Sequence, residues 1–170
     1  LKDINSDALA RGMGTIESLY RSSVKRHVLS QNQANSGFDR IISSTSDVSL
    51  KDREIVIEAA TEDLELKKKI FNKLSDQSSP NTILATNTSA LPIHELAEHI
   101  SHPERLVGIH FFNPVPRMKL VEVVRTPQTS DATLATAVRF VQSIGKLPVI
   151  VNDSPGFVVN RILLPYLVRA

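Results

Sequence analysis

Residues 54–86 read EIVIEAATEDLELKKKIFNKLSDQSSPNTILAT, and this stretch decides the fold class. It opens with a short β-branched run at residues 54–59, which is a strand pattern. From residue 62 to residue 76 the apolar residues recur at helical spacing, and residues 82–86 again have a strand pattern. A strand, a helix and a second strand in this order form the repeating unit of a parallel α/β sheet.

The alternation continues on both sides of this unit. Towards the amino end we expect a helix at residues 6–27 with Ser6 as its N-cap, a polar loop at 31–37 and a short strand at 40–44. Towards the carboxyl end the expected elements are a short helix at 91–100, strands at 106–112, 119–124 and 147–151, and helices at 131–144 and from about residue 157. The pattern predicts a parallel, doubly wound α/β sheet.

Composition narrows the class of protein. The chain has 170 residues, of which 41% are hydrophobic and 22% charged, so it can form one compact domain and is not a disordered chain. It has no cysteine, which excludes disulfides, a thiolate zinc site and a cysteine nucleophile. Its net charge is only +2, without a concentrated basic face, so we expect no nucleic-acid partner. No apolar run approaches the roughly 20 residues of a membrane helix, so we expect no membrane span.

His110 and Glu122 form a candidate acid–base pair. Strand alternation places Glu122 on one face between Leu120 and Val124, and a carboxylate buried there needs a partner. His110 ends the preceding strand, and the proline-rich turn at residues 113–116 brings the next strand back beside it. A histidine oriented by a carboxylate is a common acid–base device. On spacing alone, a structural histidine and an edge-strand glutamate remain the alternative.

Further polar residues lie where α/β sheets bind ligands. Residues 87–89 (NTS) follow the strand at 82–86 at its carboxyl end, where they contact a ligand or merely cap a helix. Asn160 lies early in the last helix, facing a cleft or water. Asp3 precedes the first helix, a position at which dinucleotide-binding folds place a ribose-binding acid and other proteins a simple helix-entry residue.

Other charged and histidine clusters favour no special site. Residues 94, 99 and 102 are histidines without the spacing of a metal pair and without an evident carboxylate partner, so we expect no metal. The basic clusters at residues 21–27 and 67–69 are interpreted as solvated helix faces, with phosphate contact as the alternative.

Four motifs in register carry a family resemblance. They are NTSAL at 87–91, HFFNPV at 110–115, LVE at 120–122 and DSPGFVVNR at 153–161. Together they resemble the NAD-dependent L-3-hydroxyacyl-CoA dehydrogenases. The opening residues 1–5 (LKDIN) and residues 88–96 are most similar to the dehydrogenase part of the multifunctional fatty-oxidation complex α subunits.

The resemblance implies oxidation of the 3-hydroxyl of an acyl-CoA substrate to a ketone, with hydride passing to NAD. His110 is then the general base, Glu122 holds its imidazole, and Ser89 and Asn160 bond around the reacting oxygen. The family pattern places the cofactor contacts at Asp3, Ala60, Thr61, Glu62, Lys67, Ser89 and Asn113. It places the coenzyme A contacts at Ser18, Lys25 and Ser89.

The resemblance also implies a domain organisation. Residues 1–152 correspond to a Rossmann-like NAD-binding domain without its first strand and glycine-rich turn. We expect the turn about 20 residues before Asp3, and the strand, turn and helix together within about 35 residues upstream of Leu1. Residues 153–170 correspond to the first helix of an all-helical second domain. The implied assembly is a homodimer or a part of a fatty-oxidation multienzyme complex, in the bacterial cytoplasm or, in a eukaryote, the mitochondrial matrix. Two alternatives stay open: a non-catalytic binding or structural relative, and a related β-hydroxyacid dehydrogenase.

Overall fold

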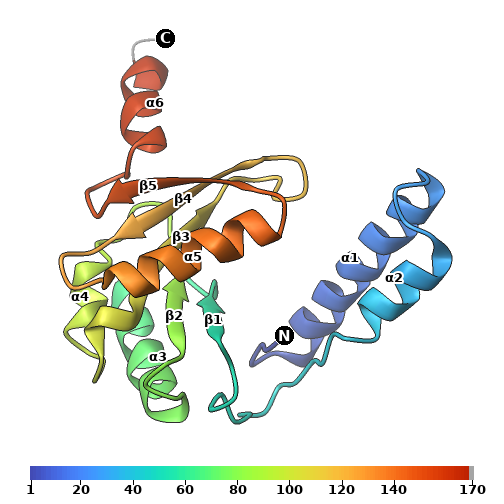
Figure 1. Ribbon diagram of the computed structural model, residues 1–170, viewed down its shortest axis with the longest axis horizontal. Coiled ribbons are helices and arrows are strands. Elements are labelled where there is room, and N and C mark those ends of the chain that lie inside the picture. Colours follow the sequence, from blue (N-terminus) through green and yellow to red (C-terminus); the bar gives the residue numbers. More distant parts are fainter. Residues whose placement is uncertain (169–170) are drawn as a thin grey trace. The chain divides into compact units, whose positions relative to one another are not determined.

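The computed structural model describes residues 1–168, with side chains up to Leu163, in two compact units. The first unit, Leu1–Val48, contains two helices, and the second, from Ser49 onward, contains a five-stranded sheet with its helices (Figure 1). The last two residues of the expected second domain, 169–170, lie outside the described part. The expected division at residues 152 and 153 remains a prediction.

The first unit begins with the expected long helix, α1 (Ser6–Lys25). Its N-cap is Asn5 and not Ser6, so that detail of the prediction is wrong. Asn5 has an extended backbone, and its side-chain oxygen accepts the N–H groups of Asp7 and Ala8. Ser6 is already helical, one position too late to cap.

A second helix, α2 (Gln31–Phe38), replaces the loop predicted at residues 31–37, so that prediction is wrong. The reason is a capping box, in which Ser30 and Gln33 satisfy each other's backbone N–H groups. Tyr20 packs so closely over Gly37 that a Cβ there would lie 2.6 Å from its hydroxyl oxygen. The strand predicted at 40–44 is also wrong, because only Ser44 pairs, in a single bridge with Lys2.

The second unit is built on a sheet with strand order β1-β2-β3-β4-β5. Its strands are β1 (Ile55–Glu58), β2 (Ile83–Thr86), β3 (Leu106–Phe111), β4 (Leu120–Arg125) and β5 (Leu147–Asn152). All neighbouring strands are parallel except β3 and β4, which are antiparallel. The prediction of a parallel sheet is therefore wrong at this one pair. The connection between these two strands holds no helix, and a short turn returns the chain antiparallel.

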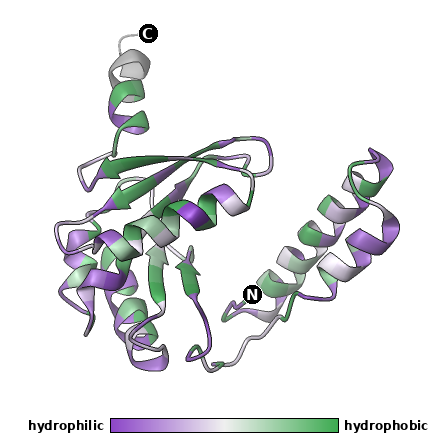
Figure 2. Ribbon diagram, viewed as in Figure 1, coloured by the Kyte–Doolittle hydropathy of each residue, from purple (hydrophilic) through white to green (hydrophobic). Residues whose placement is uncertain are grey.

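Helices cover both faces of this sheet, which confirms the doubly wound prediction. On one face lie α3 (Leu64–Gln77) and α4 (His94–Ala97), and on the other lies α5 (Asp131–Ser143) (Figure 1). The strands are predominantly hydrophobic, whereas the helices present both characters (Figure 2). α6 (Val159–Val168) follows β5. Within the described part of the chain, no helix is both long and apolar enough to cross a membrane.

The helix predicted at residues 91–100 is much shorter than expected. Only the four residues of α4 are helical, and Ile93 provides no side-chain cap at its start. The segment is held instead by buried apolar side chains, Ile93, Leu96 and Ile100. Gly108 on β3 permits this approach, because a Cβ there would lie 2.4 Å from Cδ1 of Ile93.

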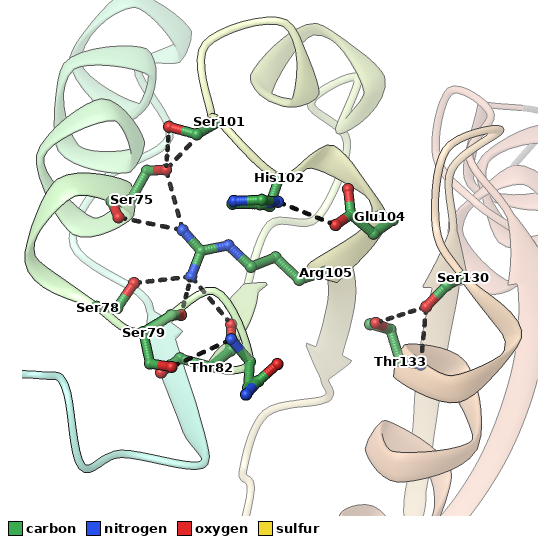
Figure 3. A network of polar contacts seen from close by, with 11 residues as sticks. Ser75, Ser78, Ser79, Thr82, Ser101, His102, Glu104, Arg105, Ser130 and Thr133 are labelled. Atoms are coloured by element: carbon green, nitrogen blue, oxygen red, sulfur yellow. Dashed lines mark hydrogen bonds and ion pairs between the residues drawn. The ribbon is translucent and has the colours of Figure 1, made fainter.

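A buried arginine joins α3 to the amino ends of the strands. Arg105 ends a 3₁₀ turn before β3, and its guanidinium donates to the hydroxyls of Ser75 (3.0 Å) and Ser78 (2.9 Å) (Figure 3). It also donates to the carbonyl oxygens of Ser75 (3.1 Å) and Ser79 (2.5 Å). Burial lowers the pKa of Arg105. The hydrogen bonds to these carbonyls and hydroxyls offset part of the cost of burying its charge.

We predict that Arg105→Met lowers the free energy of unfolding by about 2–4 kcal/mol, because it leaves these buried oxygens without their donor. Arg139→Met is the matched control, since Arg139 is exposed on α5 and donates to Thr136 on the same helix. Its effect should stay below about 0.5 kcal/mol. Urea unfolding measures both. Equal, small effects would show that the network does not stabilise the fold.

Candidate active site

His110 and Glu122 lie side by side at the centre of the second unit. They are paired across the antiparallel strands β3 and β4, and Nδ1 of His110 lies 2.8 Å from Oε2 of Glu122. Their side chains are 7% and 1% exposed, so the pair is screened from water. The short return between the two strands thus produces the juxtaposition that strand alternation indicated.

The second oxygen of Glu122 holds the start of α6. Oε1 accepts the backbone N–H groups of Val158 (3.0 Å) and Val159 (2.9 Å). Unpaired N–H groups at a helix start stabilise a negative charge, so Glu122 is held as a carboxylate acceptor from two sides. A neutral His110 that donates its Nδ1–H to Glu122 keeps Nε2 free to accept a proton. The aromatic rings of Phe112 and Phe157 flank the imidazole, with centroids 4.5 Å and 5.7 Å away.

Ser89 and Asn160 are also brought together. The side-chain amide of Asn160 donates to the carbonyl oxygen of Ser89 at 3.1 Å. The N–H of Ser89 and the hydroxyl of Thr88 donate to the two oxygens of Glu62, at 2.7 Å and 2.6 Å. Thr88 caps the following turn as well, accepting from the N–H of Leu91. These bonds connect the loops after β1 and β2 with α6 and leave Ser89 exposed.

Lys67 is buried, not solvated, so the interpretation of residues 67–69 as a solvated face is wrong for this residue. Its ammonium group lies 2.5 Å from Oε2 of Glu58 and 3.2 Å from the hydroxyl of Thr86. The other oxygen of Glu58 accepts the N–H of Ala60 at 2.7 Å. This ion pair therefore fixes the beginning of the loop that carries the candidate cofactor residues.

Two features of the sequence indicate this ion pair, although spacing in the basic cluster alone does not. Glu58 is a carboxylate in an apolar strand, as Glu122 is, and so needed a partner. Lys67 lies at helical spacing between Leu64 and Phe71, on the apolar face of α3.

The remaining candidates belong to other elements of the two units. Asp3, Ser18 and Lys25 belong to the first unit; the carboxylate of Asp3 accepts the N–H of Asn5, and the other two are exposed on α1, seven residues apart and so on one face. Asn113 is exposed in the turn after β3, and Thr61 accepts the N–H of Asp63.

Two histidines expected to lack a carboxylate partner have one, so that expectation is wrong. Nδ1 of His94 lies 2.7 Å from Asp153, and Nδ1 of His102 lies 3.2 Å from Glu104. Each histidine pairs with a single carboxylate. Among the residues that the structure describes, no group of three or more histidine and acidic side chains could hold a metal ion.

Curated relatives match this chain over nearly its whole length. A family profile described as "3-hydroxyacyl-CoA dehydrogenase, NAD binding domain" matches residues 1–154. The fatty acid oxidation complex subunit alpha of Vibrio vulnificus is 41% identical over 167 residues, which are 98% of this chain and 24% of that protein. The Acinetobacter baylyi subunit of the same name is 43% identical, over 98% of this chain and 23% of that protein. The chain thus spans about a quarter of the length of these relatives.

Solved structures with a similar fold indicate the same family. A 3-hydroxybutyryl-CoA dehydrogenase from Escherichia coli matches 99% of this chain and 36% of its own with a TM-score of 0.95 and 40% identity. The (S)-3-hydroxybutyryl-CoA dehydrogenase of Ralstonia eutropha matches 97% of this chain and 58% of its own, with a TM-score of 0.93 and 44% identity. By sequence and fold, the chain belongs to the NAD-binding domain family of the 3-hydroxyacyl-CoA dehydrogenases.

Proposed function

We propose that the protein oxidises L-3-hydroxyacyl-CoA to 3-ketoacyl-CoA with NAD, as a step of fatty-acid β-oxidation. The observation that supports this most directly is the buried His110–Glu122 pair, which presents an imidazole nitrogen as a proton acceptor. The relatives of this chain are named as fatty acid oxidation subunits and 3-hydroxybutyryl-CoA dehydrogenases, which agrees with this substrate class.

In the proposed reaction, Nε2 of His110 takes the proton of the substrate's 3-hydroxyl. Bound NAD supplies the hydride acceptor. The carboxylate of Glu122 stabilises the imidazolium that results and keeps the ring in place, since its other oxygen is fixed by the start of α6. Ser89 presents an exposed hydroxyl to the reacting oxygen, and Asn160 holds the Ser89 backbone.

The residues at the carboxyl ends of β1 and β2 fit a dinucleotide. Parallel sheets bind ligands at this edge, and exposed polar groups gather on the two loops that follow these strands. We assign the cofactor side to Ala60, Thr61, Glu62, Lys67, Ser89 and Asn113, with Asp3 on the ribose. Lys67 contributes from the interior, where its ammonium group pairs with Glu58 and so holds the start of the loop after β1.

We assign the coenzyme A contacts to Ser18, Lys25 and Ser89, as the family pattern implies. Ser18 and Lys25 lie on one face of α1, where an ammonium group can meet a phosphate and a hydroxyl can bond to it. We further propose that residues from 153 onward begin the second domain. The whole protein is proposed to act as a homodimer or within a fatty-oxidation complex, in the bacterial cytoplasm or the mitochondrial matrix.

We predict that Lys67→Met lowers the free energy of unfolding by about 3–5 kcal/mol, because Glu58 is left as a buried charge without its cation. The double variant Glu58→Gln/Lys67→Met should recover part of this loss. Lys69→Met, at an exposed position of the same helix, is the control and should change stability by less than about 0.5 kcal/mol. Chemical denaturation separates these cases, and an additive double variant would argue against the pair.

The direct test of function is NADH oxidation with acetoacetyl-CoA by the gene product at the full length that its coding sequence gives. His110→Ala should lower kcat by about 10²–10⁴-fold and leave the Kd for NADH within about threefold. Glu122→Gln should lower kcat by about 10–100-fold, because it removes the charge opposite the imidazolium. His99→Ala, an exposed histidine outside the site, should have no effect.

Either of two results would contradict the proposal. Unchanged turnover in His110→Ala would remove this residue from the mechanism. A wild-type protein that binds NADH tightly without turning over any CoA thioester would favour a non-catalytic relative, and turnover of the free acid alone would favour another β-hydroxyacid dehydrogenase.

A further inference from the structure

A second histidine–carboxylate contact lies beside the proposed active site. The Oδ2 atom of Asp153 accepts the backbone N–H of His94 at 2.7 Å. The same oxygen lies 2.7 Å from Nδ1 of the His94 ring. The Asp153 side chain is only 2% exposed, whereas that of His94 is 49% exposed. Asp153 lies in the turn that leads from β5 to α6, and His94 is the first residue of α4.

The two joined segments carry residues of the proposed site. Ser89 precedes α4 by a few residues, and Asn160 lies in the first turn of α6, just beyond the Asp153 turn. Asn160 and Ser89 form a second tie between the same segments, and Phe157 packs into the cluster that contains Ile93. The start of α6 is therefore tied to the α4 segment at three points.

We propose that Asp153 is a positioning residue, which anchors the turn before α6 on His94 and thereby aims the α6 N–H groups at Glu122. This inference rests on the proposed function of His110, and it assigns to Asp153 an effect on that base through Glu122. Nothing in the pairing requires Asp153 to touch the substrate.

The conformation of the backbone between Asp153 and Val158, whose N–H binds Glu122, explains why an anchor is needed. Gly156 and Phe157 both have a left-handed backbone, with φ of 72° and 50°. This conformation is unfavourable for phenylalanine and persists only where the surroundings impose it. The next two N–H groups, of Val158 and Val159, are those that bind Glu122. Without the contact of Asp153 with His94, the turn would adopt a less strained backbone conformation, and these two N–H groups would move away from Glu122.

The other side of the contact is firmly placed. α4 is fixed to the sheet by buried Leu96, with Ile93 and Ile100 on either side of it. Lys68 on α3 pairs with Glu95 on α4 at 3.1 Å. His94 is thus a fixed point, so the contact restrains the turn and α6 more than it restrains α4.

The test measures amide hydrogen exchange and the His110 Nδ1–H resonance by NMR on the 170-residue chain. We expect Asp153→Ala to accelerate exchange at Val158 and Val159 by about tenfold or more, and to weaken or shift the His110 signal. Asp153→Asn, which keeps an acceptor for the His94 N–H, should restore most of the protection. His94→Ala, which keeps the backbone bond only, should have an intermediate effect and serves as the readout if Asp153→Ala does not fold.

Two controls separate positioning from general stability. The Val123 amide, in the buried strand β4, reports global opening, and His102→Ala removes a partly exposed histidine with its own carboxylate partner. Positioning predicts that Val158 and Val159 respond while Val123 and the His102 variant do not. Equal acceleration at Val123, or no change at Val158 and Val159, would overturn the proposal.

Kinetics of the full-length gene product complete the test. Asp153→Ala should lower kcat by about tenfold with little change in the KM for NADH, and Asp153→Asn should recover most of the rate. A change confined to KM would overturn the inference. If the wild-type protein has no turnover, the proposed function fails, whereas the exchange result still decides whether Asp153 positions α6.

Discussion

The carboxylate of Glu122 is the interaction on which the site depends. It is 1% exposed, and its two oxygens serve different elements: one meets His110 across the sheet, and the other binds the first N–H groups of α6. An anion in this position would be costly without such partners. These partners come from β3 and the start of α6, and Glu122 itself lies on β4, so the requirement to satisfy one charge fixes the relative placement of three elements and the orientation of the imidazole.

The same physical solution recurs at the carboxyl end of β1. Glu58 on β1 divides its oxygens between Lys67 and the backbone at Ala60, as Glu122 divides its own between a side chain and a helix start. At the opposite edge of the sheet, Arg105 uses carbonyls and hydroxyls in place of a carboxylate. Buried charges thus fix the segments at both ends of the strands. At the carboxyl edge they hold loops rich in exposed polar groups, and at the amino edge they close the end of α3.

Local patterns in the sequence predict much of this architecture. The β-branched runs, the helical spacing in α3 and α5, and the isolated carboxylate at Glu122 with its return turn to His110 all follow from short-range rules. The elements that these patterns do not predict have physical explanations too. Apolar spacing does not indicate α2, because this polar helix is stabilised by its Ser30 cap. The bond of Asp153 to His94 joins residues 59 positions apart in the chain, so only the fold reveals it. The pair of Lys67 and Glu58 is local, and the apolar face of α3 already indicated that Lys67 is buried.

We infer that Glu122 holds His110 with its proton on Nδ1 and leaves Nε2 free to take another. A long-range ¹H–¹⁵N correlation spectrum of the chain measures this directly, with the His110 signals assigned by their loss in His110→Gln. We expect neutral His110 to be protonated on Nδ1, and Glu122→Gln to disturb this preference. A neutral His110 protonated on Nε2 would contradict it, because that ring could neither donate to Glu122 nor accept the substrate's proton.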